Sequence, residues 1–551
     1  MQTAMRNWGW IGAAFGLAVL LCIPLVTVAA SLFQPASQNW WATADIVLPR
    51  YALNSLALAA LVSLGTFVVG TAAAWTVVMY RFPGRPIVEV LLALPLAMPA
   101  YVMAYAIAHW LEFAGPVQTG LRETFGWTAR EYWFPEIRSL EGAAFMLTFT
   151  LYPYVYLLAR ASFIEQSVCA LEVGRSLGRG PWRLFRDVAL PLARPAILAG
   201  VALAAMETLA DYGTVDYFGV QTFTTGIYRA FFSLGDPVAA SQLATGLLGM
   251  VILGGLLLRS LKGHGRTQST TQRYRPLPST SLGPGKSLLA LAVCLAPPVI
   301  GFLLPAGILL DLAWDRGAPD VARLSELTLN SLTLALGASA LTVAIALFFA
   351  YARRITRAKA IGTASALASF NYTVPGSVIA IGVIPALALA DAGLANLFGF
   401  DRFTLLTGSI AGLVFLYVAR FFAAAHGAAK SSLARVTPSM DAAARSLGRG
   451  PLNAAFNVHL PVMLPSLLSA VLIVFLDVMK ELPGTLILRP FNFDTLAIAA
   501  YHLAADERIA ELAAPALGIV LAGLIPVAIL MRTIASGRPG GPESGDEDPR
   551  H

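Results

Sequence analysis

Charge and cysteine are both scarce in this sequence of 551 residues. Only 13% of the residues are Asp, Glu, Lys or Arg, and only three are cysteines. A water-soluble protein of this length needs far more surface charge, so the composition excludes an ordinary soluble fold. Cys22, Cys169 and Cys294 show no CxxC spacing, which argues against a disulfide framework and against a cysteine-bound metal. We expect them to be small apolar residues.

Catalytic motifs are lacking as well. The six histidines have no metal-ligand spacing, and no HExxH or nucleophile motif occurs, which argues against a membrane-embedded enzyme. The nearest approach to a P-loop is Thr280–Ser287, where a threonine replaces the first glycine and a proline-rich linker replaces the preceding strand. We therefore expect a protein that is not an enzyme, needs no cofactor, holds no metal tightly and leaves ATP hydrolysis to a partner.

Long apolar runs are what the chain has in abundance, since 57% of its residues are hydrophobic. A helix that crosses the hydrocarbon core needs about 20 apolar residues. The sequence therefore predicts an all-α polytopic membrane protein with about twelve transmembrane helices. The expected spans are 9–31, 54–80, 87–110, 141–163, 196–212, 238–258, 286–313, 330–352, 362–390, 404–426, 462–480 and 511–534.

The positive charges indicate the orientation of these spans. Most of the 38 Lys and Arg residues fall on one side of the membrane when both termini are placed in the cytoplasm. This is the positive-inside pattern and not a sign of nucleic-acid binding. The segments richest in basic residues are Arg160–Arg194, Arg259–Lys286, Arg353–Lys359 and Arg420–Arg449. We interpret the first apolar run as a membrane helix and not as a signal peptide.

A seven-residue identity shows that the chain is duplicated. RSLGRGP occurs at Arg175–Pro181 and again at Arg445–Pro451, 270 residues later. Asn54-Ser55-Leu56 returns as Asn330-Ser331-Leu332, and Pro99 has an equivalent in Pro375. We expect two six-helix units of the same orientation, related by an axis along the membrane normal. Pro99 and Pro375 should bend matching spans. These bends either only shape the helices or line a central path.

These repeats define the expected domains. The first unit should cover 1–260, with a core at about 54–258, and the second 286–534, with a core at about 330–532. Residues 261–285 are rich in Ser, Thr, Gly, Pro and Arg, so we expect a flexible cytoplasmic linker. The tail at 535–551 is predicted to be disordered.

The repeated loop predicts a helix–turn–helix outside the bilayer. Helical composition up to Leu177 ends at Gly178 and Gly180, and a second helical stretch should run over Trp182–Leu190 and end at Pro191. The second copy occupies Pro438–Pro465. A basic amphipathic loop could lie on anionic headgroups, but headgroup binding needs no particular backbone geometry. Two copies with the same glycines therefore favour docking to a protein.

The loop resembles the EAA loop of the permeases of binding-protein-dependent ABC importers, in which a glutamate and a glycine are followed by a Leu-Pro pair. The first copy reads EVGRSLG at Glu172–Gly178 and reaches VALP, whereas the second reads AAARSLG at Ala442–Gly448 and reaches VHLP. The resemblance implies a type I importer fold and ATPase coupling through Glu172, Arg175, Gly178, Pro191, Asp441, Arg445, Gly448 and Pro461. Asp441 stands one position before the usual acid, which should alter or remove its contact with the ATPase.

Two further segments, Met206–Tyr228 and Met479–Ala497, resemble the fused two-unit permeases of ferric-iron importers. This resemblance implies a bacterial inner-membrane protein that receives Fe(III) from a periplasmic binding protein. Its expected partners are two ATP-binding cassette subunits that form a homodimer, the periplasmic binding protein and the lipid bilayer, with no nucleic acid. A fused permease for thiamine or another small solute is an alternative.

Acidic residues near the outer ends of matching spans form the candidate translocation path. They are Glu207, Asp211, Asp477 and Glu481, and Tyr212 or Tyr217 could join them. Charges at membrane depth are costly and usually functional, and a hard trivalent cation prefers oxygen ligands. The competing interpretation is that these acids form structural pairs, with Lys480 as one partner. An ion-coupled secondary transporter remains the other class of function, although the most repeated element is a loop and not a span.

Overall fold

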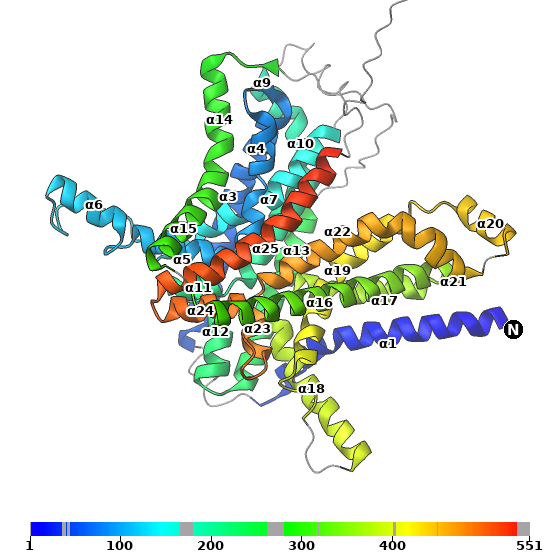
Figure 1. Cartoon of the computed structure of the whole chain (residues 1–551). Coiled ribbons are helices and arrows are strands. Elements are labelled where there is room, and N and C mark those ends of the chain that lie inside the picture. Colours follow the sequence, from blue (N-terminus) through cyan, green and yellow to red (C-terminus); the bar gives the residue numbers. More distant parts are fainter. Residues whose placement is uncertain are drawn as a thin grey trace, which may run out of the picture.

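A computed structural model describes residues 2–35, 40, 45–165, 180–261, 280–317, 319–399, 404–448 and 450–536. The protein is almost entirely helical (Figure 1). The first half contains α1 (Gln2–Ala30), α3 (Leu48–Met79), α4 (Arg85–Leu91), α5 (Ala100–Leu111), α6 (Pro116–Phe125), α7 (Leu140–Glu165), α9 (Pro181–Leu184), α10 (Leu190–Ala210), α11 (Gly213–Tyr217), α12 (Phe223–Tyr228) and α13 (Pro237–Leu261). The second half contains α14 (Pro284–Pro298), α15 (Leu304–Arg316), α16 (Val321–Thr356), α17 (Lys359–Ser369), α18 (Gly376–Phe398), α19 (Ile410–Leu433), α20 (Pro438–Ser446), α21 (Pro451–Ala454), α22 (Leu460–Met479), α23 (Pro483–Leu488), α24 (Leu496–Ala505) and α25 (Ile509–Ser536).

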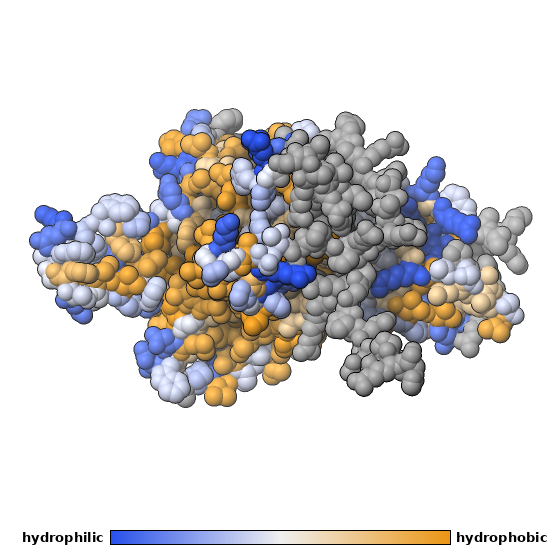
Figure 2. Space-filling model, turned by 90° about the horizontal axis from the view of Figure 1, so that it is seen from above, coloured by the Kyte–Doolittle hydropathy of each residue, from blue (hydrophilic) through white to orange (hydrophobic). Residues whose placement is uncertain are grey.

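The predicted membrane helices are present. Within the described residues, eleven helices are long and apolar enough to cross a membrane, and a bent pair would make a twelfth. Many large apolar side chains on these helices are exposed, among them Leu253 and Leu257 on α13 and Leu288 on α14. Figure 2 shows the result as an apolar surface over much of the visible face. Exposed leucine of this extent is suited to contact with lipid tails.

The third span of each half is broken and not merely kinked. Pro99 and Pro375 stand immediately before α5 and α18 with extended backbones, and each follows a short 3₁₀ turn, η2 (Leu94–Ala97) or η6 (Phe370–Thr373). In the first half the two helical pieces meet at 96°. The residue before a proline avoids the helical region, and the proline itself lacks an N–H, so the helix restarts there. The prediction of matching bends is confirmed in this stronger form.

The repeated Asn-Ser pair, Asn54-Ser55 and Asn330-Ser331, makes equivalent hydrogen bonds in both halves. The Asn54 side chain donates to the Gln221 carbonyl at 2.9 Å, and the Asn330 side chain donates to the Asp494 carbonyl at 3.1 Å. The hydroxyls of Ser55 and Ser331 accept from the backbone N–H groups of Phe223 and Leu496. The second long helix of each half thus fixes the beginning of α12 or α24.

The helix that follows each repeated loop does not end at its Leu-Pro pair, contrary to the prediction for Pro191. A π-helical turn, η3 (Phe185–Ala189) or η7 (Ala455–His459), runs directly into α10 or α22. Pro191 and Pro461 then lie in the first turn of the next α-helix. Proline is tolerated in a first turn, and the π turn begins a new hydrogen-bond register there, so one helix continues from the repeated loop into the membrane span.

The leading helix of each half packs on the opposite half. Helix α1 lies against α16, α17 and α18, and the α14–α15 helix lies against α3, α4 and α5 (Figure 1). The Thr27 hydroxyl donates to the Gly382 carbonyl at 2.7 Å, and the Asn371 side chain donates to the Leu21 carbonyl at 2.7 Å. The two six-helix units expected from the sequence are therefore interlocked.

The linker between the halves acquires structure at its end. β1 (Tyr80–Arg81) and β2 (Thr280–Ser281) pair in parallel, and the Leu282 N–H donates to the Arg81 carbonyl. The sequence predicts a flexible linker up to residue 285. The end of this linker is instead extended, because it pairs with the backbone N–H and C=O groups that follow α3 and so satisfies the hydrogen bonds of both segments. The rest of the predicted linker, 262–279, and the tail after Ser536 lie outside the described residues.

Gly382 provides a test of the interlocked arrangement. A Cβ atom at this position would come within 2.0 Å of the Pro24 backbone oxygen, and backbone cannot turn aside as a side chain can. We expect Gly382→Ala to destabilise the protein by about 1–3 kcal/mol, as overpacking does. The measurement is the thermal unfolding midpoint in detergent. Gly393→Ala on the same helix meets nothing within 4 Å and should leave the midpoint unchanged; equal effects of the two variants would contradict close packing of α1 on α18.

Candidate functional site

The two halves meet where α10 and α22 end. Helix α10 stops directly before Asp211 and α22 stops two residues before Glu481, and each is followed by a short helix, α11 or α23. From this meeting point the helices diverge toward α9 in one half and α20 in the other (Figure 1). Direct contacts cross between the halves here: a Cβ on Gly213 would touch the Leu482 side chain, and the Tyr228 hydroxyl donates to the Pro483 carbonyl.

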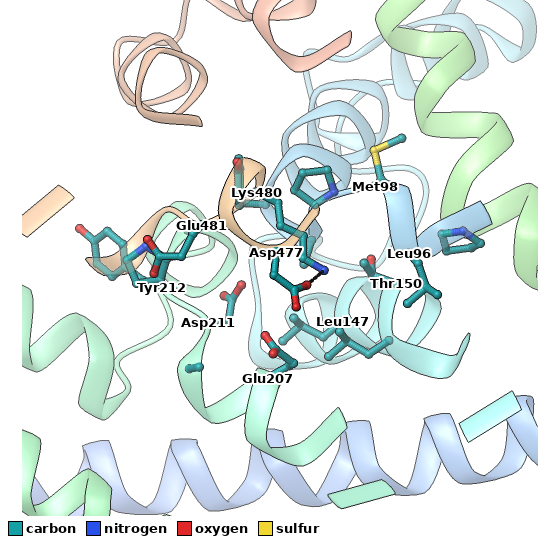
Figure 3. A pocket seen from close by; sticks show the side chains of 18 of the residues that line it. Leu96, Met98, Leu147, Thr150, Glu207, Asp211, Tyr212, Asp477, Lys480 and Glu481 are labelled. Atoms are coloured by element: carbon teal, nitrogen blue, oxygen red, sulfur yellow. Dashed lines mark ion pairs between the residues drawn. The ribbon is translucent and has the colours of Figure 1, made fainter. Parts of the chain in front are cut away.

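A cavity of about 90 Å³ lies between the halves at this level. All four acids of the predicted path, Glu207, Asp211, Asp477 and Glu481, line it, together with Arg420 and Lys480. Figure 3 shows the carboxylates of Glu207, Asp211 and Asp477 facing the same space. Pro99 also lines the cavity, as expected, whereas its repeat equivalent Pro375, for which the same was expected, is not among the lining residues. The volume of the cavity is sufficient for several water molecules.

Two of the acids are structural caps. Asp211 accepts from the backbone N–H groups of Thr214 and Val215 at 3.1 Å, and from the Thr214 hydroxyl at 3.0 Å. Glu481 accepts in the same way from Gly484 and Thr485. The two positions are 270 residues apart, so the duplication preserves this carboxylate cap at the start of α11 and α23. Each satisfies donors that a helix start leaves free.

The cavity's basic residues both come from the second half. The Arg420 guanidinium lies 2.7 Å from Glu481, and Lys480 lies 3.1 Å from Asp477. A Cβ on Gly376 would overlap both partners of the first pair, which accounts for a glycine directly after the Pro375 break. The alternative that these acids form structural pairs is therefore correct for Asp477 and Glu481.

Glu207 differs from the other three acids. It is the repeat equivalent of Asp477, but the first half has Ala210 where the second has Lys480, and Thr150 where the second has Arg420. Among the described residues the Glu207 carboxylate makes no hydrogen bond and no ion pair within 4 Å, and the charges of Lys480 and Arg420 act on it only from a longer distance. A half-buried carboxylate without a close basic partner is the part of this cavity best suited to a visiting cation.

A second, larger cavity of about 610 Å³ adjoins the first, and Tyr212 lines both. Its walls come from α11, α12 and the following π turn in the first half, and from α23 and α24 in the second. Burial and the neighbouring Asp216 carboxylate raise the pKa of Tyr212 and of Tyr501. Tyr217, the other tyrosine suggested for the path, contacts Arg138 instead.

Comparison with known proteins explains this arrangement. Residues 66–264 match the family described as "Binding-protein-dependent transport system inner membrane component". The chain is 25% identical over 493 residues to the Fe(3+)-transport system permease protein FbpB 2 of Haemophilus influenzae, covering 87% of this chain and 89% of that protein. These similarities fit a fused two-unit permease of a binding-protein-dependent ABC importer. The two halves of the chain correspond to two permease units fused in one polypeptide.

Other relatives extend the comparison. The probable ABC transporter permease protein y4fN of Sinorhizobium fredii is 22% identical and covers 98% of each chain. The sulfate transport system permease protein CysT of Salmonella typhimurium is 29% identical over 206 residues, which are 36% of this chain and 69% of that protein. The family implies partnership with an ATPase and with a binding protein.

The second repeated loop of this permease has the predicted helix–turn–helix form. Helix α20 ends in a turn in which Gly448 has a φ of +71°, and α21 follows. A left-handed residue of this kind favours glycine. In the first copy, Glu172, Arg175 and Gly178 lie outside the described residues, as does the side chain of Arg445.

Asp441 faces its own bundle. Its carboxylate lies 2.6 Å from the Arg354 guanidinium at the end of α16 and 2.7 Å from the His459 ring. Burial alone would raise the pKa of Asp441, but Arg354 and His459 outweigh it and hold the pKa below its usual value. Arg354 also donates to the carbonyls of Leu433 and Val436. The displaced acid thus anchors α20 to the membrane helices.

Sequence reasoning missed two residues of the cavities. Arg420 was assigned to a basic inner loop, but it lies on α19 with 8% of its surface exposed. Its signal was available, because an arginine inside an apolar run is rare and usually marks a functional or paired position. Tyr501 had no such signal, since its partner Tyr212 is 289 residues away in the sequence.

Removing the charge of Asp441 tests the anchor. We expect Asp441→Asn to reduce ATP-driven transport several-fold, because α20 loses its ion pairs with Arg354 and His459 and transmits the movement of the ATPase less completely. The measurement is the ratio of solute imported to ATP hydrolysed in proteoliposomes. Asn457→Ala, whose side chain bonds only the Asn453 carbonyl, is the control. An unchanged ratio in Asp441→Asn would show that the anchor is not needed for coupling.

Proposed function

We propose that this permease imports Fe(III) handed over by a periplasmic binding protein. The central cavity is the observation that carries the proposal, because four carboxylates and only two basic side chains line it. The formal excess of negative charge favours a cation. The similarity to the Haemophilus Fe(3+) permease, which extends over both halves, supports the same substrate.

An oxyanion is the second candidate, since the CysT relative serves sulfate and Arg420 and Lys480 lie in the cavity. Both basic groups are already paired with carboxylates. An anion about 4 Å from the Glu207 carboxylate would meet a repulsion of about 4 kcal/mol at an effective dielectric constant of about 20. The charge distribution therefore favours Fe(III) over sulfate. Thiamine is also a cation, so the preference for Fe(III) over thiamine rests on the similarity to the Haemophilus Fe(3+) permease and not on the charge of the cavity.

The proposed path begins at the outer cavity and passes Tyr212 into the central one. There Glu207 attracts the cation. Asp211, Asp477 and Glu481 already have hydrogen-bond or ion-pair partners, and they add to the negative electrostatic potential of the cavity. Binding of this kind is weak enough to allow release toward the cytoplasm, as transport requires. The outer ends of the helices are in contact, so we assign the described conformation to a state closed on the outer side.

The proposed energy source is a homodimer of ATP-binding cassette subunits, because one chain offers two related docking loops. Glu172, Arg175, Gly178 and Pro191 would couple one subunit, and Arg445, Gly448 and Pro461 the other, with Asp441 as the internal anchor. We propose the same bounds for the two permease units as the sequence predicts, 1–260 and 286–534. Both termini are then cytoplasmic and the chain itself hydrolyses no ATP.

Neutralising Glu207 tests the substrate. We expect Glu207→Gln to lower Fe(III) uptake at least about tenfold, which corresponds to a loss of about 1.4 kcal/mol of cation stabilisation. Uptake of radioactive iron into proteoliposomes that contain the ATPase and the binding protein is the measurement. Glu123→Gln on the exposed outer helix α6 should behave as the unsubstituted protein. Wild-type iron uptake by Glu207→Gln, or ATP-driven import of sulfate and not iron, would overturn the proposal.

Replacing both loop glycines tests the docking role. At position 448, a residue other than glycine would be strained by roughly 1–2 kcal/mol, because the backbone φ angle there is positive. We expect the double variant Gly178→Leu, Gly448→Leu to lose co-purification with the ATPase and to lose ATP-driven uptake. Gly120→Leu on α6, where an added Cβ atom meets nothing within 4 Å, is the control. Retained ATPase binding and uptake in the double variant would refute docking at these loops.

A further inference from the structure

Three oxygen atoms gather in the outer cavity, at the contact between the halves. The Tyr212 and Tyr501 hydroxyls are 2.9 Å apart, and the Tyr501 hydroxyl donates to the Asp216 carboxylate at 2.8 Å. Tyr212 and Asp216 belong to the segment around α11, whereas Tyr501 belongs to α24 of the other half. The cluster therefore spans the interface between the two permease units.

Packing holds these oxygens in position. The Tyr212 ring stacks on the Tyr228 ring with 3.6 Å between centroids and 14° between planes. Tyr228 is fixed in turn, because its hydroxyl donates to the Pro483 carbonyl of the other half. Tyr212 retains only 6% of its surface exposed. A ligand set held by neighbouring rings loses little freedom when it binds a cation.

The chemistry of the cluster suits a hard trivalent cation. Phenolate and carboxylate oxygens are hard ligands, and tyrosine is a known ligand of ferric iron in proteins. No group of three or more His, Cys, Asp or Glu side chains able to hold a metal occurs in the described part of the chain. A cation acceptor here would therefore depend on the two phenols.

The basic residues that line this cavity have other contacts. Arg489 pairs with Asp494, and Arg229 interacts with the Tyr51 hydroxyl. His502 lies 3.4 Å from Arg489. These contacts hold the three basic side chains against the cavity wall. The charged group that is hydrogen-bonded to the phenols is therefore the Asp216 carboxylate.

We propose that Tyr212, Tyr501 and Asp216 form a transient acceptor site for Fe(III) between the binding protein and the central cavity. The inference rests on the proposed function. Each phenol that coordinates iron releases its proton to the water of the outer cavity. Because the ligands come from both halves, the site is complete only while α11 and α24 are in contact. Separation of the halves divides the ligand set and keeps the binding transient.

The experiment uses the complete importer in lipid nanodiscs with ferric nitrilotriacetate as the probe. Phenolate bound to Fe(III) gives a visible charge-transfer band, which iron bound to carboxylates alone does not give. We expect the unsubstituted importer to show this band. Tyr501→Phe should lose at least half of its intensity and lower iron uptake about tenfold, and Tyr212→Phe should do the same. Tyr132→Phe, in the outer loop and outside the cavity, should retain both.

The outcomes separate this inference from the proposed function. Iron uptake by the unsubstituted importer without a charge-transfer band overturns the acceptor site and leaves Fe(III) import standing. A band of full intensity in both Tyr501→Phe and Tyr212→Phe likewise overturns it. Failure of the unsubstituted importer to take up iron while it imports another solute overturns both. Basal ATPase activity shows that each variant is assembled.

Discussion

Charged side chains in the interior of an apolar helical bundle must be satisfied by the protein itself. Translocon measurements place the cost of a lone charge at the centre of a membrane helix at about 2.5–3.5 kcal/mol. Here Asp211 and Glu481 accept hydrogen bonds from helix starts, and Arg420 and Lys480 pair with carboxylates. Helix breaks at Pro99 and Pro375 and the small residue Gly376 make room for this arrangement. Glu207 stands apart because its close surroundings provide no comparable partner.

The duplication explains why the caps are shared and why the charges are not. The cap at Asp211 recurs at Glu481 because both halves need a short helix at the same place. The basic residues do not recur, since Ala210 and Thr150 occupy the positions equivalent to Lys480 and Arg420. The charges that line the cavity between the two units are therefore distributed unequally between the halves. The first half provides an accessible carboxylate, and the second half provides carboxylates that are already neutralised.

The sequence was informative wherever a local pattern had one structural solution. Apolar length gave the spans, proline predicted the breaks at Pro99 and Pro375, and the spacing of RSLGRGP indicated the turn at Gly448. It was uninformative about partners in three dimensions. Nothing local pairs Tyr501 with Tyr212, or Asp441 with Arg354. The crossing of α1 onto α17 and α18 depends on close backbone contact at Gly382, and a uniformly apolar helix does not reveal which neighbour it will choose.

Helices α1 and α14 each pack on the opposite half, and this packing determines which parts of the protein can move together. A body that rotates as the first half would carry α14 on its surface, although α14 belongs to the second repeat, while α15 contacts both α5 and α25. Its counterpart must carry α1. Each mechanical arm is thus a hybrid of both repeats, and the segment between Leu261 and Thr280 joins arms that already hold one another. A chain cut there would be expected to stay assembled, since exchanged helices, and not the covalent connection, keep the transporter in one piece.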